Sequence, residues 1–241
     1  MESQESKPLR AALYIDGFNL YHPIRRMGAD HQHLKWACLW QLGLGLTVPR
    51  GQELVKVVFC TAIPSVRQNA DRRTQHIRFN DAQRARGVTV LEGHYVPEPI
   101  EVDGVPTGEQ KWTEKQTDIN VALALIIDGL EDEYDVALLL SADTDQVATA
   151  RVFVEKLKPL GKKMVGIAPP DRVAPIGYGS YQIPSIVLQK LDIERCIMPE
   201  RVEGNGLVVF RPDSYAPPAG WMHPNDRPKG KPPKIPKGVR L

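Results

Sequence analysis

The chain has 241 residues, 42% of them hydrophobic, and a formal net charge of +2, so it can form one large domain with appendages or two small domains. This weak charge neither requires nor excludes a nucleic-acid partner, and three scattered cysteines without zinc spacing exclude a disulfide framework and a zinc module. A polar start without a signal segment, and no apolar run of membrane length, predict a cytoplasmic protein without membrane contact.

Segments typical of strands and helices alternate along the chain. Apolar runs predict strands at residues 11–15, 54–60, 88–91, 135–141 and 163–168. Helical spacing predicts helices at residues 34–46, 68–86, 116–130 and 145–158. Residues 95–112 are rich in Pro and Gly, and Asp103-Gly104 predicts a hairpin there. This order predicts an α/β fold, a Rossmann-like three-layer sandwich whose mostly parallel sheet has five or six strands, with a small hairpin insertion.

The last part of the chain has a different composition. Residues 212–241 contain eight prolines, and from Arg227 onward there are six Lys or Arg residues and no acid. Such a composition cannot bury a core, so we expect an extended tail. The predicted organisation is a domain at residues 10–200 followed by a Pro-rich, basic C-terminal tail at residues 201–241.

Four aspartates stand where strands end or a helix begins. Asp16 follows one apolar run, Asp143 and Asp145 follow another, and Asp118 lies in the first turn of a predicted helix. Right-handed crossovers bring the carboxyl ends of parallel strands to one edge of the sheet. Carboxylates gathered away from water are unfavourable unless a cation neutralises them. We therefore predict a site for Mg²⁺ or Mn²⁺, with one or two ions, because hard carboxylate oxygens suit these metals.

Each acid also has a purely structural interpretation. Asp16-Gly17 is a common turn pair, and an acid at Asp118 interacts well with the helix macrodipole. The segment 143–145 could cap the next helix. The metal interpretation accounts for all of them at once, because these strand ends and this helix start are expected on the same edge.

Three short motifs resemble those of a known family. Segments 14–20, 114–118 and 141–145 are similar to the signature motifs of NYN domains, which belong to the PIN-like nuclease superfamily. The resemblance covers roughly residues 10–200, with the motifs in the right order. It implies a metal-dependent ribonuclease on a Rossmann-like sheet, with RNA, expected to be single-stranded, as the partner.

The resemblance also implies roles for individual residues. Carried over by position, the catalytic residues are Asp16, Asp118, Asp143, Asp145 and Asn19, with the four aspartates as the metal ligands. Asn19 would orient a ligand or a metal-bound water, while Glu114 and Ser141 would support the carboxylates. Lys115, beside the acids, is a candidate phosphate contact or a solvated first-turn residue. The third motif departs from the family pattern, since Ala142 replaces a glycine and Gln146 an aromatic residue.

Basic and aromatic residues near the predicted active edge are candidates for contacts with nucleic acid. Arg67, Arg72, Arg73 and Arg78 lie in or just before the predicted helix at residues 68–86, and Trp112 precedes the motif that contains Asp118. Phosphate contacts depend on such positive charge, and aromatic rings can stack on unpaired bases. The alternatives are a solvated helix face for the arginines and a hairpin anchor for Trp112.

Two other functions remain to be weighed against the ribonuclease. A phosphohydrolase of the haloacid dehalogenase type requires two aspartates separated by one residue after the first strand, whereas Gly17-Phe18 follows Asp16 here. An RNA- or protein-binding module of the same fold would keep the acids with little or no catalytic turnover. The sequence is also compatible with a homo-oligomer. The ribonuclease is the function that we predict.

Overall fold

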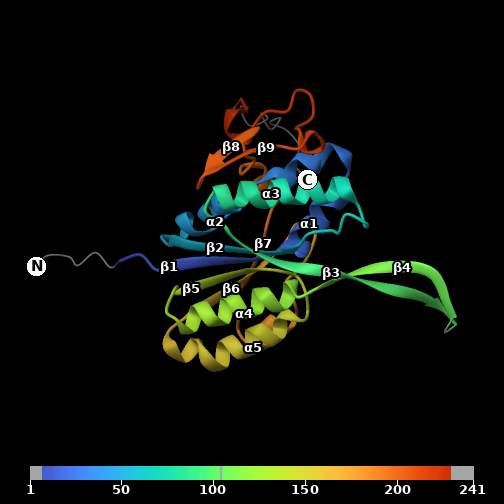
Figure 1. The fold of residues 1–241 in the computed structure, drawn as a ribbon. Helices are drawn as coiled ribbons and strands as arrows, with labels where there is room; N and C mark the ends of the chain where they lie inside the picture. The colour runs from blue at the N-terminus through green and yellow to red at the C-terminus, as the bar shows by residue number, and fades with distance from the viewer. Residues whose placement is uncertain (1–6, 104, 229–241) are drawn as a thin grey trace, which may run out of the picture.

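The computed structural model describes residues 7–103 and 105–228, which form a central sheet of seven strands. These are β1 (Arg10–Asp16), β2 (Glu53–Ala62), β3 (Thr89–Val102), β4 (Val105–Lys115), β5 (Val136–Leu140), β6 (Lys163–Ala168) and β7 (Ser185–Val187). Their order in the sheet is β4-β3-β2-β1-β5-β6-β7 (Figure 1), and every pair except β3 and β4 is parallel. The predicted α/β class and the mostly parallel sheet are confirmed, with seven strands in place of five or six.

Helices cover both faces of this sheet (Figure 1). They are α1 (Gly17–Arg26), α2 (Leu39–Thr47), α3 (Ala70–Ala85), α4 (Thr117–Leu130), α5 (Gln146–Lys156), α6 (Gly177–Ser180) and α7 (Lys190–Glu194). Helices α1, α2 and α3 lie on one side, and α4 and α5 on the other. Of the helices described, none combines the length and apolarity needed to cross a membrane.

The central strand β1 is buried on both faces. Ala11, Leu13 and Ile15 belong to the core shared with α1 and α2, whereas Ala12 and Tyr14 belong to the core beneath α4 and α5. This division follows from the strand repeat, because successive side chains point to opposite faces. A parallel strand that is covered by helices on both faces needs apolar side chains at every position. Burial on both faces therefore explains why the sequence of β1 is a continuous apolar run.

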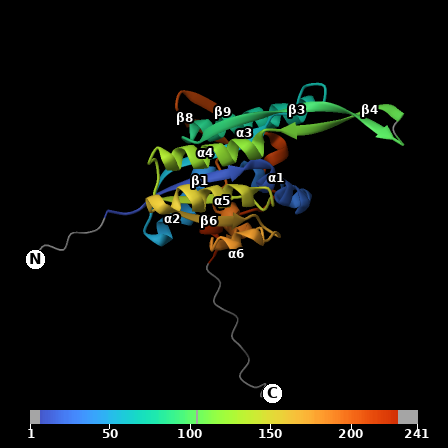
Figure 2. The ribbon, with the colours of Figure 1, turned by 90° about the horizontal axis from the view of Figure 1, so that it is seen from below.

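The expected small hairpin is a larger structure, because β3 and β4 are both strands of the central sheet, with β4 at its edge. β3 pairs in parallel with β2 over residues 89–93 and then continues, paired antiparallel with β4, away from the rest of the molecule (Figure 2). Of the predicted Asp103-Gly104 turn, Asp103 has a φ of 53° directly after β3, and Gly104 lies outside the described residues. Residues 105–111 of β4 are all exposed, so no apolar alternation on this arm reveals the strand.

The structure differs from the extended tail expected at residues 212–241. Before that segment, β8 (Arg201–Gly204) and β9 (Leu207–Phe210) form a hairpin on α3. Within it, Tyr215 is buried in a cluster with Trp36 and Ala82, and the ring of Trp221 lies 5.3 Å from that of His33. A few large aromatic side chains therefore hold a segment whose overall composition is poor in apolar residues. Residues 229–241 lie outside the described residues.

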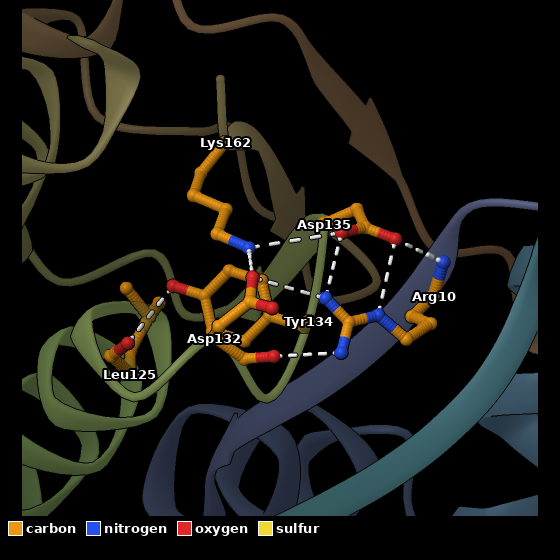
Figure 3. A network of polar contacts seen from close by, with 6 residues as sticks. All are labelled: Arg10, Leu125, Asp132, Tyr134, Asp135 and Lys162. Atoms are coloured by element: carbon orange, nitrogen blue, oxygen red, sulfur yellow. Dashed lines mark hydrogen bonds and ion pairs between the residues drawn. The ribbon is translucent and has the colours of Figure 1, made fainter. Parts of the chain in front are cut away.

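A polar network joins the amino-terminal ends of β1 and β5 (Figure 3). The backbone N–H of Arg10 donates to Asp135 Oδ2 at 2.8 Å, and its guanidinium donates to Asp135 Oδ1 at 2.9 Å. The same guanidinium donates to the carbonyl oxygen of Asp132 at 2.7 Å, and Lys162 pairs with the Asp132 carboxylate. The network fixes the register of the two central strands at the edge opposite the candidate site.

Candidate functional site

The carboxyl ends of β1 and β5 form the point at which the strand order reverses. From β1 the chain goes to β2 on one side, and it later returns to β5 on the other side. In open α/β sheets, ligands bind beyond the carboxyl ends of the strands at such a switch point. Asp16 is the last residue of β1, and Ser141 and Asp143 follow directly after β5. The fold therefore places three of the predicted site residues at the position where α/β proteins bind ligands.

Asp16 is buried, and hydrogen bonds occupy both of its carboxylate oxygens. Oδ1 accepts from the backbone N–H groups of Phe18 at 3.1 Å and Asn19 at 3.2 Å, which makes Asp16 the N-cap of α1. Oδ2 accepts from Asn19 Nδ2 at 2.5 Å and from Ser141 Oγ at 3.2 Å. The capping interpretation is thus correct for Oδ1, while the side-chain donors on Oδ2 connect Asp16 to the end of β5.

Gly17 allows α1 to start directly after Asp16. A Cβ at this position would lie 2.6 Å from the carbonyl oxygen of Cys60 and 2.8 Å from the ring of Phe59. The helix therefore begins in close contact with β2, and this contact positions Asn19 two residues further on. The Asp-Gly pair, which the sequence suggests as a turn, serves close packing here.

Asn19 and Ser141 link the end of β1 to the loop after β5. Asn19 Oδ1 accepts from the backbone N–H of Ala142 at 3.0 Å. Ser141 Oγ, which donates to Asp16, also accepts from the backbone N–H of Asp143 at 3.1 Å. Two side chains thus hold the Asp16 carboxylate and the Asp143 backbone in a fixed relationship, and both are residues that the sequence motifs single out.

Burial raises the pKa of the Asp16 carboxyl above its usual value, and the hydrogen bonds from Asn19 and Ser141 counteract this rise. The negative charge of Asp143 adds to the increase. A cation beside Asp16 would favour its ionised form.

Asp118 reaches this edge from the start of α4. Glu114 Oε1 accepts from the backbone N–H of Thr117 at 2.9 Å and so caps the helix, and the residue between the hairpin and α4, Gln116, has a φ of 81°. A non-glycine residue in this left-handed region is strained. The strained link turns the chain sharply from β4 into α4, so that Glu114 and Asp118 fall at the same end of the sheet.

The residues that depart from the family pattern have structural roles. Ala142 has no positive φ, so it does not need the conformational freedom of glycine. Gln146 is buried, and its Nε2 donates to the carbonyl oxygen of Asp118 at 3.2 Å. Gln146 therefore ties α5 to the first turn of α4, the turn that contains Asp118. Asp145 is exposed, and its N–H donates to Asp143 Oδ1 at 3.0 Å.

The oxygen donors at this edge suit a hard divalent cation. Within residues 7–103 and 105–228, no three His, Cys, Asp or Glu side chains lie close enough together to hold one ion. Mg²⁺, however, keeps several waters and usually takes only one or two carboxylates directly. Asp118 and Asp143 are half-buried and so are open to such an ion, whereas Asp16 is buried.

The predicted phosphate and base contacts separate into two groups. Lys115 pairs with Glu98 of the hairpin at 3.0 Å, and Arg73 donates to the carbonyl oxygen of Pro64 at 3.0 Å. Arg67 and Arg78 are exposed. In contrast, Arg72 and Trp112 line a cleft of about 360 Å³. This cleft also includes Phe18, two residues after Asp16, and so lies beside the aspartates at the carboxyl ends of β1 and β5, which we call the acidic edge.

Sequence analysis missed the α1 wall of this cleft. Phe18, Tyr21, His22 and Arg25 line it from one face of the helix. Their spacing of i, i+3, i+4 and i+7 is the signal that could have revealed this face. It was missed because no helix was predicted at these positions.

Comparisons with known proteins leave the family of this chain open. No protein-family model matches it. A curated protein from Pseudomonas putida, named 6-hydroxy-3-succinoylpyridine 3-monooxygenase, is 28% identical over 170 residues, covering 58% of this chain and 54% of that protein. The chain thus spans about half the length of this relative. A crystal structure of a protein of unknown function from Vibrio parahaemolyticus has a TM-score of 0.48 and 17% identity, covering 78% of this chain and 97% of that chain.

Proposed function

We propose that this protein is a metal-dependent ribonuclease, an NYN domain with the PIN-like form of the α/β sandwich, that hydrolyses phosphodiester bonds in RNA. One observation carries the proposal, namely the contacts that run from Asp16 through Ser141 to Asp143 at the switch point of the sheet. Helix capping accounts for the two backbone donors on Asp16, but it does not account for the side-chain donors from Asn19 and Ser141. Fixing a carboxylate in this way is what a metal-binding edge requires.

The four aspartates have different tasks in this proposal. Asp118 and Asp143 would hold the ion, Asp145 would add negative charge at the exposed side, and Asp16 would complete the site from its buried position. Mg²⁺ or Mn²⁺, when bound, would neutralise these acids and supply a water of lowered pKa. Asn19 and Ser141 would keep Asp16 ionised and oriented, because their donors favour its charged form.

Lys115 is available to a phosphate in spite of its ion pair. Its partner Glu98 lies on the exposed hairpin, and both side chains are close to half-exposed. Such exposed ion pairs contribute little to stability, so a phosphate oxygen can replace Glu98 at little cost. Lys115 would then contact the substrate next to Asp118 and Glu114.

The relative named as a monooxygenase favours a second candidate function. A hydroxypyridine ring with a succinoyl side chain is planar and carries a carboxylate, and the cleft lined by Arg72 and Trp112 offers both cationic and aromatic groups. This function requires dioxygen and an electron donor. A binding module that retains the fold without turnover is the third alternative, and it predicts RNA retention without cleavage.

The deciding experiment is incubation of the purified protein with labelled single-stranded RNA and with DNA of matched sequence. Reactions with Mn²⁺, Mg²⁺ and EDTA would be compared, with Asp143→Asn in parallel and Arg151→Gln, an exposed substitution on α5, as the control. We expect cleavage of RNA that requires metal, disappears in Asp143→Asn and persists in Arg151→Gln. The dependence of the rate on metal concentration distinguishes one ion from two.

The same protein preparation tests the competing functions. Retention of RNA on a gel without cleavage under any metal condition would replace the ribonuclease by the binding module. Oxidation of a reduced nicotinamide that depends on 6-hydroxy-3-succinoylpyridine, and that survives Asp143→Asn, would favour the monooxygenase.

A further inference from the structure

Three separate elements each direct one face into the cleft beside the acidic edge. Helix α1 contributes the face that runs from Phe18 to Arg25, and α3 contributes Arg72 and His76, which are one turn apart. The hairpin contributes Tyr95 from β3 with Trp112 and Glu114 from β4. Tyr95 pairs with Glu114 in the strand register, so these hairpin side chains share one face. The cleft is therefore formed by the regular surfaces of three elements.

The lining of the cleft carries more positive than negative charge. Within the part of the chain that the structure describes, Arg25 and Arg72 form no ion pair. Glu114 is the one acid among the described lining residues, and its Oε1 already accepts from the N–H of Thr117. Two arginines that face a cleft without a partner are suited to an anion, and Arg binds phosphate through paired donors.

The neighbouring titratable groups do not change this balance. Burial, followed by the charge of Arg72, lowers the pKa of His76 to about 4. Burial, followed by the charges of Arg25 and Arg72, lowers the pKa of Lys35 to about 8. The pKa of His22 is also lowered, first by burial and then by Arg25. Both histidines are thus mostly neutral at pH 7, so the two arginines are the main permanent positive charges on the cleft lining.

The hairpin contributes aromatic rings to the cleft. Tyr95 and Trp112 are half-buried on the hairpin, and the ring of Phe18 lies edge-on to Tyr95 with 6.1 Å between the centroids. A deeper cavity beyond Tyr21 has a volume of only about 50 Å³, which is enough for a water and too small for a base. A planar ligand therefore has to lie in the outer cleft, against the hairpin rings.

From these features we infer that the cleft binds one unpaired nucleotide of an RNA strand, with its phosphate at Arg25 and Arg72 and its base against Tyr95 and Trp112. The inference deepens the proposed ribonuclease function and rests on it for the role of the acidic edge. Arg25 lies about 10 Å along α1 from Phe18, and Phe18 is two residues after Asp16. The nucleotide would thus be a close neighbour of the phosphodiester at the acids. A paired base cannot expose its face to these rings, so the strand must be single-stranded here.

The test is a binding experiment that does not depend on cleavage. A short fluorescein-labelled single-stranded RNA is titrated by fluorescence anisotropy with Asp143→Asn protein in EDTA, at several salt concentrations. Added to this background are Arg72→Gln, Trp112→Ala and the conservative Trp112→Phe, with Arg151→Gln as the charge-matched control. Circular dichroism and urea midpoints check that every variant is folded.

Each substitution has its own expected effect. Arg72→Gln should raise Kd about tenfold and reduce the slope of log K against log salt by about 0.7, the value for one phosphate contact on a single strand. Trp112→Ala should raise Kd about fivefold or more without changing the slope. Trp112→Phe and Arg151→Gln should stay near the parent, and duplex RNA should bind more weakly than the single strand.

The outcomes separate this inference from the proposed function. The cleft assignment is overturned if Arg72→Gln and Trp112→Ala bind like Arg151→Gln, if duplex binds as well as single strands, or if the parent binds no RNA. RNA binding that needs the cleft, in a wild-type protein that cleaves nothing with Mn²⁺ or Mg²⁺, removes the ribonuclease and leaves the nucleotide site. Metal-dependent cleavage with unchanged Kd values in the cleft variants supports the ribonuclease and removes the nucleotide site in the cleft.

Discussion

Asn19 joins Asp16 to the backbone of Ala142 through the two ends of its side-chain amide. Nδ2 donates to Asp16 Oδ2 at 2.5 Å, and Oδ1 accepts from the Ala142 N–H at 3.0 Å. Because an amide has one donor end and one acceptor end, no other neutral side chain of this size satisfies both partners. One side chain therefore connects the carboxylate at the end of β1 to the backbone of the loop after β5, in addition to the contact from Ser141.

This relationship predicts that Asn19→Ala impairs turnover more than binding. Asp16 loses one donor and the β5 loop loses one acceptor, so the free energy of unfolding should fall by about 1–3 kcal/mol. Residues that orient a metal ligand typically contribute 10–100-fold, so we expect kcat for RNA to fall by about that factor. Single-turnover kinetics and anisotropy would measure the two effects. Equal losses in kcat and in RNA affinity would contradict a positioning role.

Gly17→Ala should destabilise the protein by about 1–3 kcal/mol, because it overpacks a tight contact. The new Cβ would lie 2.6 Å from the carbonyl oxygen of Cys60. Gly45→Ala is the matched control, since Gly45 is an exposed residue of α2 where an added Cβ would have no neighbouring atom within 4 Å. That substitution should stabilise the protein by about 0.4–1 kcal/mol. Urea unfolding measures the change in the free energy of unfolding for both variants. If Gly17→Ala stabilised the protein as Gly45→Ala does, the contact at Gly17 would have relaxed to accept a methyl group.

A second pair of substitutions compares hydrogen bonds to a charged and to a neutral acceptor. The Tyr14 hydroxyl donates to the buried Asp128 Oδ2 at 2.7 Å, and Lys56 Nζ lies 2.8 Å from Asp128 Oδ1. The Tyr134 hydroxyl donates to the carbonyl oxygen of Leu125 at 2.9 Å. Tyr14→Phe should cost about 1.5–3 kcal/mol and Tyr134→Phe about 0.5–1.5 kcal/mol. Thermal and urea unfolding give the order, and the reverse order would contradict an ionised Asp128.

The network around Asp135 predicts a stability that depends on pH. Hydrogen bonds from Arg10 lower the pKa of the Asp135 carboxyl from 3.8 to about 2 in the folded protein. The unfolded chain therefore takes up a proton at higher pH than the folded protein does, so the contribution of Asp135 is complete above pH 4 and is lost as the pH falls toward 2. Asp135→Asn should be less stable than the wild type at pH 7, and the difference should shrink below pH 4. Urea unfolding across this range measures it, and a constant difference would rule out the ionised contact as its source.

The parallel strands could be predicted because burial on both faces of the sheet requires continuous apolar runs, which are visible in the sequence. Helix α1 was not predicted, since Pro23 lies within it and a proline in a helical pattern argues against a helix. The hairpin of β8 and β9 carried a signal that went unused. Asn205 and Gly206 form its turn with φ values of 48° and 76°, and Asn-Gly is a strong two-residue hairpin pair.

The acidic edge could be predicted because its aspartates follow directly after strands, and the ends of apolar runs in the sequence show where the strands end. The prediction that Asp16 and Asp143 lie at the same edge of the sheet depended only on β1 and β5 being parallel neighbours, which they are. The cleft could not be predicted in the same way, because Arg25, Arg72 and Trp112 come from elements whose mutual placement depends on packing. Within the arginine-rich segment, the exposed side of α3 and the side facing α1 look alike in the sequence.

The distal part of the hairpin formed by β3 and β4 contributes nothing to the core. Residues 105–111 are exposed, whereas Trp112 and Glu114 at its base line the cleft. The outer arm can therefore be shortened, extended or exchanged without disturbing the sheet, the helix cap or the acids. Related proteins could diverge in what they recognise by changing this arm alone, and an engineer could graft a recognition peptide there while the rest of the molecule stays intact.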